Sequence, residues 1–315
     1  MTFTDVQTSN SDLLPIEWSN EVIKAMAQSS CALGLSRRRT MSTRQVRMPA
    51  ASALAGAYWV GGTDSTDLKQ TTKSEWAGVN LIVEELAALV AIPHAHRDDI
   101  NFDVWEETKP QIVEAMGRKL DAAVFFGVDK PATWPDSLFD SALAAGQAVA
   151  EGTTDDLASD IALSAQSLKA RGHPTTGFAC EPGFQWGLVG LRSTDGHPIY
   201  QTDLAGPIKT GLYGYPQMEC GNGGWRDDLA SVIHGDFSKS IIGIRQDISF
   251  TPHESGVISD ETGAVVFNAM QQDSTVWRAV FRVAWARANP ATRTGPNADT
   301  ATGKFPWSVI LPASS

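Results

Sequence analysis

The sequence has few cysteines, no long apolar run and little positive charge, and each of these absences excludes a class of protein. Its three cysteines, Cys31, Cys180 and Cys220, are odd in number and far apart, which indicates free thiols rather than a disulfide framework. No stretch approaches the ~20 apolar residues of a membrane span. The first residues show no basic region followed by an apolar one, so no signal peptide is expected. These features predict a protein made in the cytoplasm that does not contact membranes.

Catalytic motifs are also missing. There is no Gly-x-Ser-x-Gly elbow, and no cysteine lies near a histidine in a known nucleophile pattern. Residues Gly221–Gly224 lack the lysine and the strand–loop–helix context of a phosphate loop, so a plain mobile loop is expected there. The sequence therefore predicts a protein that is not an enzyme and that has no cofactor.

One alternative of another class is a metal-dependent hydrolase. His94 and His96 flank one residue, and Asp98 and Asp99 follow closely. Imidazole and carboxylate groups are common metal ligands, but this spacing matches no helical two-histidine motif and no third ligand group is evident. A polar turn before a helix explains the same residues, so no metal site is predicted.

The chain is organised around one long predicted helix, Asn101–Gly127. Asn101 or Asp103 can cap its start, and acidic residues in its first turns suit the positive end of the helix dipole. At ~1.5 Å per residue it would run the length of an ordinary domain. Its apolar residues recur at three- and four-residue steps and so share one stripe: Trp105, Ile112, Met116, Leu120, Ala123 and Gly127.

The remaining pattern mixes helices with antiparallel strands, which predicts an α+β fold. Further helices are predicted over Ile16–Ser29, Pro135–Ala150 and Thr154–Arg171. Strands are predicted over Glu75–Ile92, with a possible irregularity at Glu84-Glu85, and over Phe178–Cys180 and Trp277–Trp285. Residues Ser231–His234 and Ser240–Phe250 are predicted to form a hairpin around Gly235-Asp236.

The only basic cluster consists of Arg37, Arg38, Arg39, Arg44 and Arg47. Nucleic-acid recognition is not favoured, because the net charge of the chain is −11 and no aromatics are interleaved with these arginines.

A long two-stranded arm is predicted from this cluster onward. An alternating strand pattern over Arg44–Met48 and a second extended run at Tyr58–Val60 are separated by small residues, with almost nothing apolar to form a core. An isolated hairpin is not stable in water, so the exposed Tyr58 and Trp59 imply a partner surface.

Taken in order, these segments resemble the major capsid protein family of tailed bacteriophages, which has the Hong Kong 97-type fold. The resemblance extends from Leu13 to about Pro290. No single motif is decisive, but the ordered set is specific. It comprises IPHAHRDDINFDVWEE before the long helix, RKLDAAVFFG at its end, GLYGYPQ, HGDFSKSIIGIRQDISF and QQDSTVWRAVFRVAWARANP.

The resemblance implies a domain organisation. It comprises an N-terminal arm (1–36), an extended loop (37–74), a peripheral domain (75–133 and 236–315) that includes the spine helix (101–127), and an apical domain (134–235). Two features depart from the family. Gly61-Gly62 follow Tyr58-Trp59-Val60, where relatives often have a glutamate. Met1 stands nearly at the arm, so either scaffolding is a separate protein or the chain is numbered without it.

The resemblance also implies a function. The protein is expected to self-assemble into hexamers and pentamers of an icosahedral phage head that encloses double-stranded DNA, located in the virion and assembled in the host bacterial cytoplasm. Portal and scaffolding proteins are the expected partners, with a decoration protein as a further option, and DNA is contacted only non-specifically. The alternative within the fold is an encapsulin-type nanocompartment shell protein.

The expected interface lies on the arm and loop. It comprises Trp18, Tyr58, Trp59 and the five arginines named above, and we expect the arginines to pair with carboxylates of an adjacent subunit. The candidate partners are Asp98, Asp99, Glu106 and Glu107. Lys69 and Lys73 lie in or near the loop, but nothing identifies a crosslinking partner for them.

Overall fold

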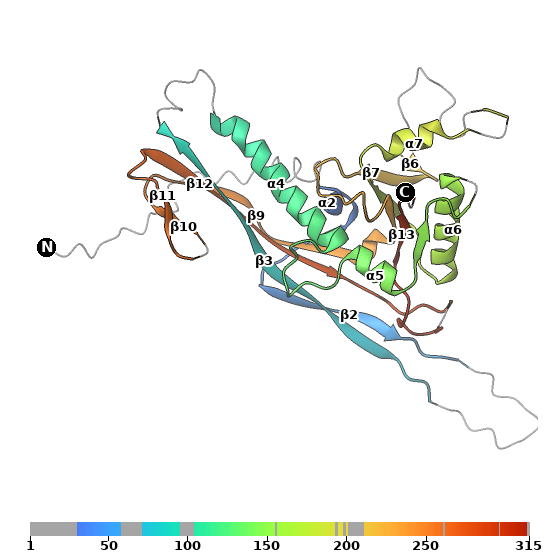
Figure 1. The fold of residues 1–315 in the computed structure, drawn as a ribbon. Helices are drawn as coiled ribbons and strands as arrows, with labels where there is room; N and C mark the ends of the chain where they lie inside the picture. The colour runs from blue at the N-terminus through green and yellow to red at the C-terminus, as the bar shows by residue number, and fades with distance from the viewer. Residues whose placement is uncertain are drawn as a thin grey trace, which may run out of the picture.

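The structure is a computed structural model that describes residues 30–57, 71–94 and 104–313, apart from residues 155, 193–194, 198–199, 201–210, 261 and 296. Two sheets and one long helix, α4, dominate it (Figure 1). The α+β fold class predicted from the sequence is confirmed. Among the described residues, no helix combines the length and the apolar character needed to cross a bilayer.

The first sheet has five strands in the order β1-β9-β12-β3-β2. Their bounds are β1 Arg37–Thr40, β2 Gln45–Ala53, β3 Glu75–Pro93, β9 Ser240–His253 and β12 Ser274–Arg287. The predicted strands at Glu75–Ile92 and Trp277–Trp285 are thus confirmed. The possible irregularity predicted at Glu84-Glu85 is absent from this pairing, because β3 and β12 keep one register from Ser274↔Pro93 to Ala284↔Val83.

Helix α4, Val104–Phe126, lies along this sheet (Figure 1). The predicted stripe is buried at Ile112, Met116, Leu120 and Ala123. Trp105 stacks on Trp277 of β12, with ring centroids 3.8 Å apart. The helix ends at Gly127, which has a φ of +71°, a conformation that glycine adopts without steric cost.

The second sheet has six strands in the order β4-β13-β8-β5-β7-β6. Their bounds are β4 Ala148–Ala150, β5 Gly177–Cys180, β6 Gly211–Leu212, β7 Tyr215–Glu219, β8 Val232–Gly235 and β13 Trp307–Leu311. Three helices accompany it: α5 Leu138–Ala144, α6 Leu157–Ala170 and α7 Phe184–Gly190. The strand predicted at Phe178–Cys180 and the helix predicted over Thr154–Arg171 are confirmed.

Two predictions about this region are wrong. The helix expected over Pro135–Ala150 stops at Ala144, because Gly146 turns the chain with a φ of +62° and β4 follows. The hairpin expected over residues 231–250 does not form, since β8 pairs with β5 and β13 whereas β9 pairs with β12 and β1. The chain passes from one sheet to the other through Gly235 and a short 3-10 turn, η2 (Phe237–Lys239).

The C-terminal strand also crosses between the sheets. Strand β13 lies between β4 and β8, in the sheet built mainly by the segment predicted to be apical. The predicted boundaries place residues 236–315 in the peripheral domain. Strand β13 falls within that range but pairs in the sheet of the predicted apical segment. The domain division itself stays a prediction.

Two smaller elements complete the described chain. Helix α2, Cys31–Leu35, packs against α4 near the N-terminal end of the described residues. Strands β10 (Val257–Ser259) and β11 (Val265–Asn268) form a hairpin between β9 and β12. Its apolar side chains Val257, Val265 and Val266 are exposed.

Candidate subunit interface

Strands β2 and β3 continue beyond the five-stranded sheet as a two-stranded arm (Figure 1). Strand β2 is the outer strand of the sheet, and its register with β3 runs from Gln45↔Ile82 to Ala53↔Glu75. Side chains alternate between exposed and half-buried along its first half, and Trp76 on the facing strand is 67% exposed. The part of the arm that the structure describes therefore has no core of its own.

The far end of β2 is held by the segment between β12 and β13. The Leu54 N–H donates to the Asp299 carbonyl at 2.9 Å, and the Ala291 N–H donates to the Ala51 carbonyl at 2.8 Å. The Arg293 guanidinium donates to the Ala55 carbonyl at 2.7 Å. These bonds fix the direction in which the arm leaves the body while leaving its faces uncovered.

The fold divides the predicted basic cluster between the two outer strands of the first sheet. Arg37–Arg39 lie on β1 and are all exposed. Arg44 and Arg47 are exposed at the start of β2, and a Cβ added at Gly78 would collide with the Arg47 side chain, which lies across it. Between the two groups, Met41 is buried against Leu81 and anchors the crossing.

None of these five arginines forms an ion pair with a carboxylate within the described part of the chain. Of their predicted partners, Glu106 is exposed on the first turn of α4, at the far end of the molecule from the arm (Figure 1). Asp98, Asp99 and the side chain of Glu107 lie outside the described residues. So do three predicted interface aromatics, Trp18, Tyr58 and Trp59.

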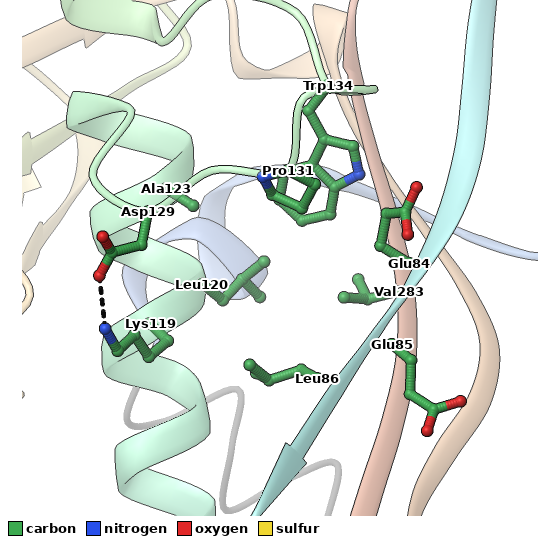
Figure 2. Close-up of a pocket in the computed structure, with 10 residues that line it drawn as sticks. All are labelled: Glu84, Glu85, Leu86, Lys119, Leu120, Ala123, Asp129, Pro131, Trp134 and Val283. Atoms are coloured by element: carbon green, nitrogen blue, oxygen red, sulfur yellow. Dashed lines mark hydrogen bonds and ion pairs between the residues drawn. The ribbon is translucent and has the colours of Figure 1, made fainter. Parts of the chain in front are cut away.

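A cavity of about 170 Å³ lies between α4, β3 and the turn that follows α4 (Figure 2). Two polar pairs stand at its rim: Lys119 donates to Asp129 at 2.6 Å, and Thr133 donates to Glu84 at 2.7 Å. Four charged residues also line it, Glu84, Glu85, Lys119 and Asp129, but most of its surface is apolar, so it suits an inserted apolar side chain. The apolar lining consists of Leu86, Leu120, Ala123, Pro131, Trp134 and Val283.

The N-terminal end of the described chain is attached by one buried carboxylate, that of Asp121 on α4. It accepts hydrogen bonds from the Ser30 hydroxyl at 2.6 Å, the Cys31 N–H at 3.0 Å and the Ala32 N–H at 2.9 Å. A fourth donor, the Asn222 amide, lies 2.7 Å away. Burial raises the pKa of Asp121 to about 6, although these hydrogen bonds act to lower it. The start of α2 and the loop after β7 are thereby tied to the same point of α4.

The sequence-based predictions did not include this attachment at Asp121. The loop Gly221–Gly224 was expected to be mobile, and the structure corrects this: Asn222 is nearly buried, and its Oδ1 accepts a bond from the Gly224 N–H at 3.0 Å. The available signal was Asp121 itself. It is the single charge in the otherwise apolar run from Leu120 to Val128, and a buried charge needs several donors.

The residues proposed for a metal-dependent hydrolase do not come together as far as the structure describes them. His94 Nε2 lies 2.9 Å from the Thr275 hydroxyl, and its Nδ1 lies 3.7 Å from the Asp273 carboxylate. His96, Asp98 and Asp99 lie outside the described residues. In the described part of the chain, the group with metal-ligand potential is Cys31, Asp121 and Cys220, at a different place.

Comparison with known proteins points to one family. The family model described as the phage capsid family matches residues 10–292. A solved chain of Microbacterium phage Oxtober96 is 34% identical, with a TM-score of 0.79 over 90% of this chain and 91% of that one. A chain of Mycobacterium phage Bobi is 26% identical, with a TM-score of 0.78 over 97% of both.

A more distant likeness concerns the fold alone. A chain described as the capsid of an empty GTA particle is 18% identical, with a TM-score of 0.64 over 91% of this chain and 90% of that one. No curated protein matches the chain.

Proposed function

The chain belongs to the phage capsid family, and from that premise we propose that it assembles as hexamers and pentamers into an icosahedral phage head around double-stranded DNA. It is a structural major capsid protein with the Hong Kong 97-type fold, and it forms an oligomeric shell in the virion. The family predicted from the sequence is confirmed. The hydrolase alternative is wrong. The encapsulin alternative is not favoured, because the matching family model is that of phage capsids and the similar solved chains come from phages.

The observation that carries the proposal is the arm of β2 and β3. A ribbon with exposed faces and an exposed tryptophan is poorly stabilised on its own. Covering it with a neighbouring copy would bury its side chains and remove an open strand edge. We therefore place the arm of one subunit across the body of the next, with Trp18, Tyr58 and Trp59 as further interface residues.

The arginines supply the second part of the proposal. In a chain of net charge −11, neighbouring copies repel one another unless opposite charges meet at their contacts. We propose that Arg37–Arg39, Arg44 and Arg47 meet carboxylates of an adjacent subunit, with Asp98, Asp99, Glu106 and Glu107 as partners. Within the described residues none of these arginines has an ion pair with a carboxylate, which leaves them available to the carboxylates of another copy.

The remaining parts of the proposal follow from the family. The segments 1–36, 37–74, 75–133 with 236–315, and 134–235 serve as N-terminal arm, extended loop, peripheral domain and apical domain. Assembly takes place in the bacterial cytoplasm with portal and scaffolding proteins, and a decoration protein is a further candidate partner. The acidic chain contacts packaged DNA only non-specifically.

The proposal is tested by size-exclusion chromatography and negative-stain microscopy of the purified full chain, alone and co-expressed with candidate scaffolding proteins. Closed shells or capsomers of five and six copies support it. A chain that stays monomeric in every co-expression would contradict it. Nucleic acid in shells from infected cells supports a phage head, whereas a cargo enzyme inside would revive the encapsulin alternative.

The charged interface has its own test. Each exposed ion pair contributes only ~0.2–1 kcal/mol, but reversing Arg37–Arg39 to glutamate removes three attractions per copy and adds three repulsions. We expect lower shell yield and a changed dependence of assembly on sodium chloride, measured by light scattering. The control is Arg192→Glu, an exposed arginine near the second sheet. Unchanged assembly and salt dependence in the triple variant would refute the pairing.

A further inference from the structure

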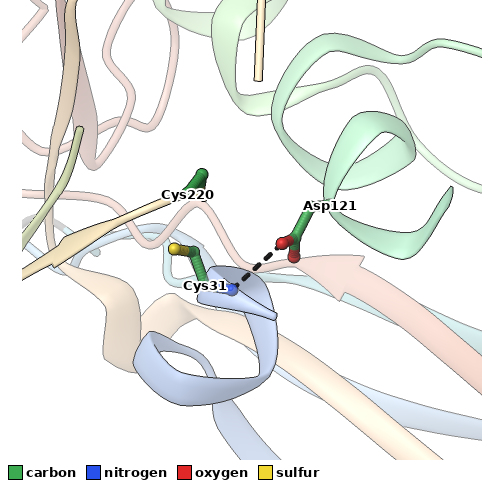
Figure 3. A group of neighbouring side chains, drawn as sticks. All are labelled: Cys31, Asp121 and Cys220. Atoms are coloured by element: carbon green, nitrogen blue, oxygen red, sulfur yellow. Dashed lines mark hydrogen bonds between the residues drawn. The ribbon is translucent and has the colours of Figure 1, made fainter. Parts of the chain in front are cut away.

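Two buried thiols face each other at the point where the N-terminal segment joins the body. Cys31 is the first residue of α2, and Cys220 directly follows β7. The ligand atoms of Cys31, Asp121 and Cys220 all lie within 4.8 Å of one another (Figure 3). Both cysteines are buried and unoxidised. No other function of the chain uses this pair.

We propose that Cys31 and Cys220 are an oxidation site, at which a disulfide forms and locks the N-terminal segment to the loop after β7. One acceptor atom holds the backbone of Cys31 and the side chain of Asn222, close to Cys220 in the chain. Asp121 Oδ2 accepts from the Cys31 N–H at 3.0 Å and from Asn222, two residues after Cys220, at 2.7 Å. The sulfurs therefore start close together, and the disulfide brings them to a separation of about 2.05 Å.

The same cluster is less suited to a metal ion. Both oxygens of Asp121 are occupied by four hydrogen-bond donors, which leaves two thiols as available ligands. A cation would also face the N–H groups at the start of α2, where the helix dipole is positive. Joining the two sulfurs requires neither the displacement of these donors nor a change in the carboxylate.

The chemistry is thiol–disulfide exchange with a small-molecule disulfide such as oxidised glutathione. One cysteine thiolate attacks the oxidant, releases one glutathione and forms a mixed disulfide. The second thiolate then displaces the other glutathione. Two S–H bonds are lost, one S–S bond forms, and the two electrons and two protons leave with two glutathione thiols.

Burial sets when this reaction occurs. It raises the pKa of Cys220, so this thiol stays protonated while α2 is docked, and both sulfurs are shielded from an oxidant. A local opening of residues 30–36 is needed to admit the oxidant. A reducing cytoplasm would keep the pair as thiols, and an oxidising medium would convert it. This timing rests on the proposed function, because it assumes that a particle is released from the host. Formation of the disulfide does not depend on that function.

The consequence is a covalent loop from residue 31 to residue 220. A crosslink that closes a long loop removes more freedom from the unfolded chain than a short one does. In the oxidised subunit, α2 should stay attached to the body under conditions that detach it in the thiol form. Cys180 is also buried, and its carbonyl accepts the Cys220 N–H at 3.0 Å. It therefore provides the matched control.

The test incubates the purified full chain, unassembled and as particles, with oxidised glutathione, and then alkylates it under denaturing conditions. A low urea concentration is included to promote opening of α2. We expect two of the three thiols to be lost, a peptide linking Cys31 to Cys220, and a thermal midpoint raised until dithiothreitol is added. Cys180→Ser should behave like the wild type, and Cys31→Ser and Cys220→Ser should form no link.

Three results would overturn the proposal: all three thiols remaining free after oxidation, a stable mixed disulfide with glutathione in place of the link, or a link that uses Cys180. Zinc retained at one ion per subunit and lost in Cys31→Ser would instead assign the cluster to a metal. Since the link is scored on the unassembled chain as well, a failure to build shells would count against the proposed function and not against the disulfide.

Discussion

At the scale of single residues, the carboxylate of Asp121 joins α4, the start of α2 and the loop after β7. It is fully buried and receives two hydrogen bonds on each oxygen. Such a group is costly to bury unless every acceptor position is used. The attachment of the N-terminal segment to the body therefore depends strongly on this side chain.

Asp121→Asn tests that dependence. The amide replaces one acceptor oxygen by an NH₂ group that faces two of the four donors, so at least one buried N–H loses its acceptor whichever way the amide turns. We expect the free energy of unfolding to fall by about 2–4 kcal/mol, with earlier proteolysis near residues 30–36. Asp129→Asn, which breaks only the exposed pair with Lys119, should cost no more than ~1 kcal/mol. Equal losses in the two variants would contradict this role of Asp121.

His234 on β8 is predicted to give the fold its sensitivity to acid. It is fully buried, its Nε2 lies 2.8 Å from the Ser164 hydroxyl, and burial lowers its pKa from 6.5 to about 4. Because the pKa of His234 is lower in the folded than in the unfolded chain, the unfolded chain takes up a proton first as the pH falls. The contribution of the neutral ring to stability is therefore complete above pH 6.5 and is lost as the pH falls through 4. The linked loss is about 3 kcal/mol at most. Burial also lowers the pKa of His173 to about 4, so it adds a loss in the same direction. Urea titrations between pH 7 and 4 should therefore show a clearly smaller loss in His234→Gln than in the wild type.

Asp121 acts in the opposite direction over part of the same range. Its pKa is raised from 3.8 to about 6, so its contribution is complete below pH 3.8 and is lost as the pH rises through 6. In His234→Gln the gain from Asp121 is opposed by the remaining loss from His173, whose pKa is also lowered to about 4, so the dependence on pH should be shallow. A loss in His234→Gln as steep as in the wild type would show that the acid sensitivity has another source.

At the scale of secondary-structure elements, Gly235 decides that β8 and β9 enter different sheets. It has a φ of +152°, and a Cβ at this position would collide with the carbonyl of Pro306. Gly235→Ala should therefore destabilise the fold by at least about 3 kcal/mol, seen as a lower urea midpoint or a loss of soluble protein.

Gly187 on α7 is the matched control, because an added Cβ there meets nothing within 4 Å. Alanine favours a helix over glycine, so Gly187→Ala should be neutral or stabilise by up to ~1 kcal/mol. A Gly235→Ala variant as stable as the control would mean that the switch between sheets does not depend on this close approach.

Elements set by local sequence patterns could be predicted, whereas contacts between residues far apart in the chain could not. The stripe of α4 and the alternation of β12 are local patterns, so both elements could be predicted within a few residues. The partners of β8 and β9 depend on strands elsewhere in the chain, and the Gly235-Asp236 pair resembles an ordinary hairpin turn. The Asp121 attachment was missed for the same reason: Ser30 and Asn222 stand 91 and 101 positions from it.

At the scale of the whole molecule, two elements project at opposite ends (Figure 1), and both carry exposed apolar side chains. The β10–β11 hairpin exposes Val265 and Val266, and Met270 beside it is 80% exposed. The β2–β3 arm exposes Trp76. A soluble monomer seldom carries apolar groups on protruding elements unless a partner covers them, whereas a subunit with neighbours on both sides requires such contacts.

Trp76 and Trp186 provide a matched pair for this argument, because each is 67% exposed in the single chain. Trp76 lies on the arm opposite Ala51, and Trp186 lies on α7. Replacing either by alanine removes few contacts within one chain, so both variants should unfold within ~0.5 kcal/mol of the wild type. If the arm lies on a neighbouring copy, Trp76→Ala also removes a large aromatic anchor from that contact, at a cost of about 2 kcal/mol or more per interface. Shell yield, measured by sedimentation and negative-stain microscopy, should therefore fall in Trp76→Ala well below that of Trp186→Ala. Normal shell yield in Trp76→Ala, or a loss of monomer stability confined to it, would place this tryptophan outside the contact between subunits.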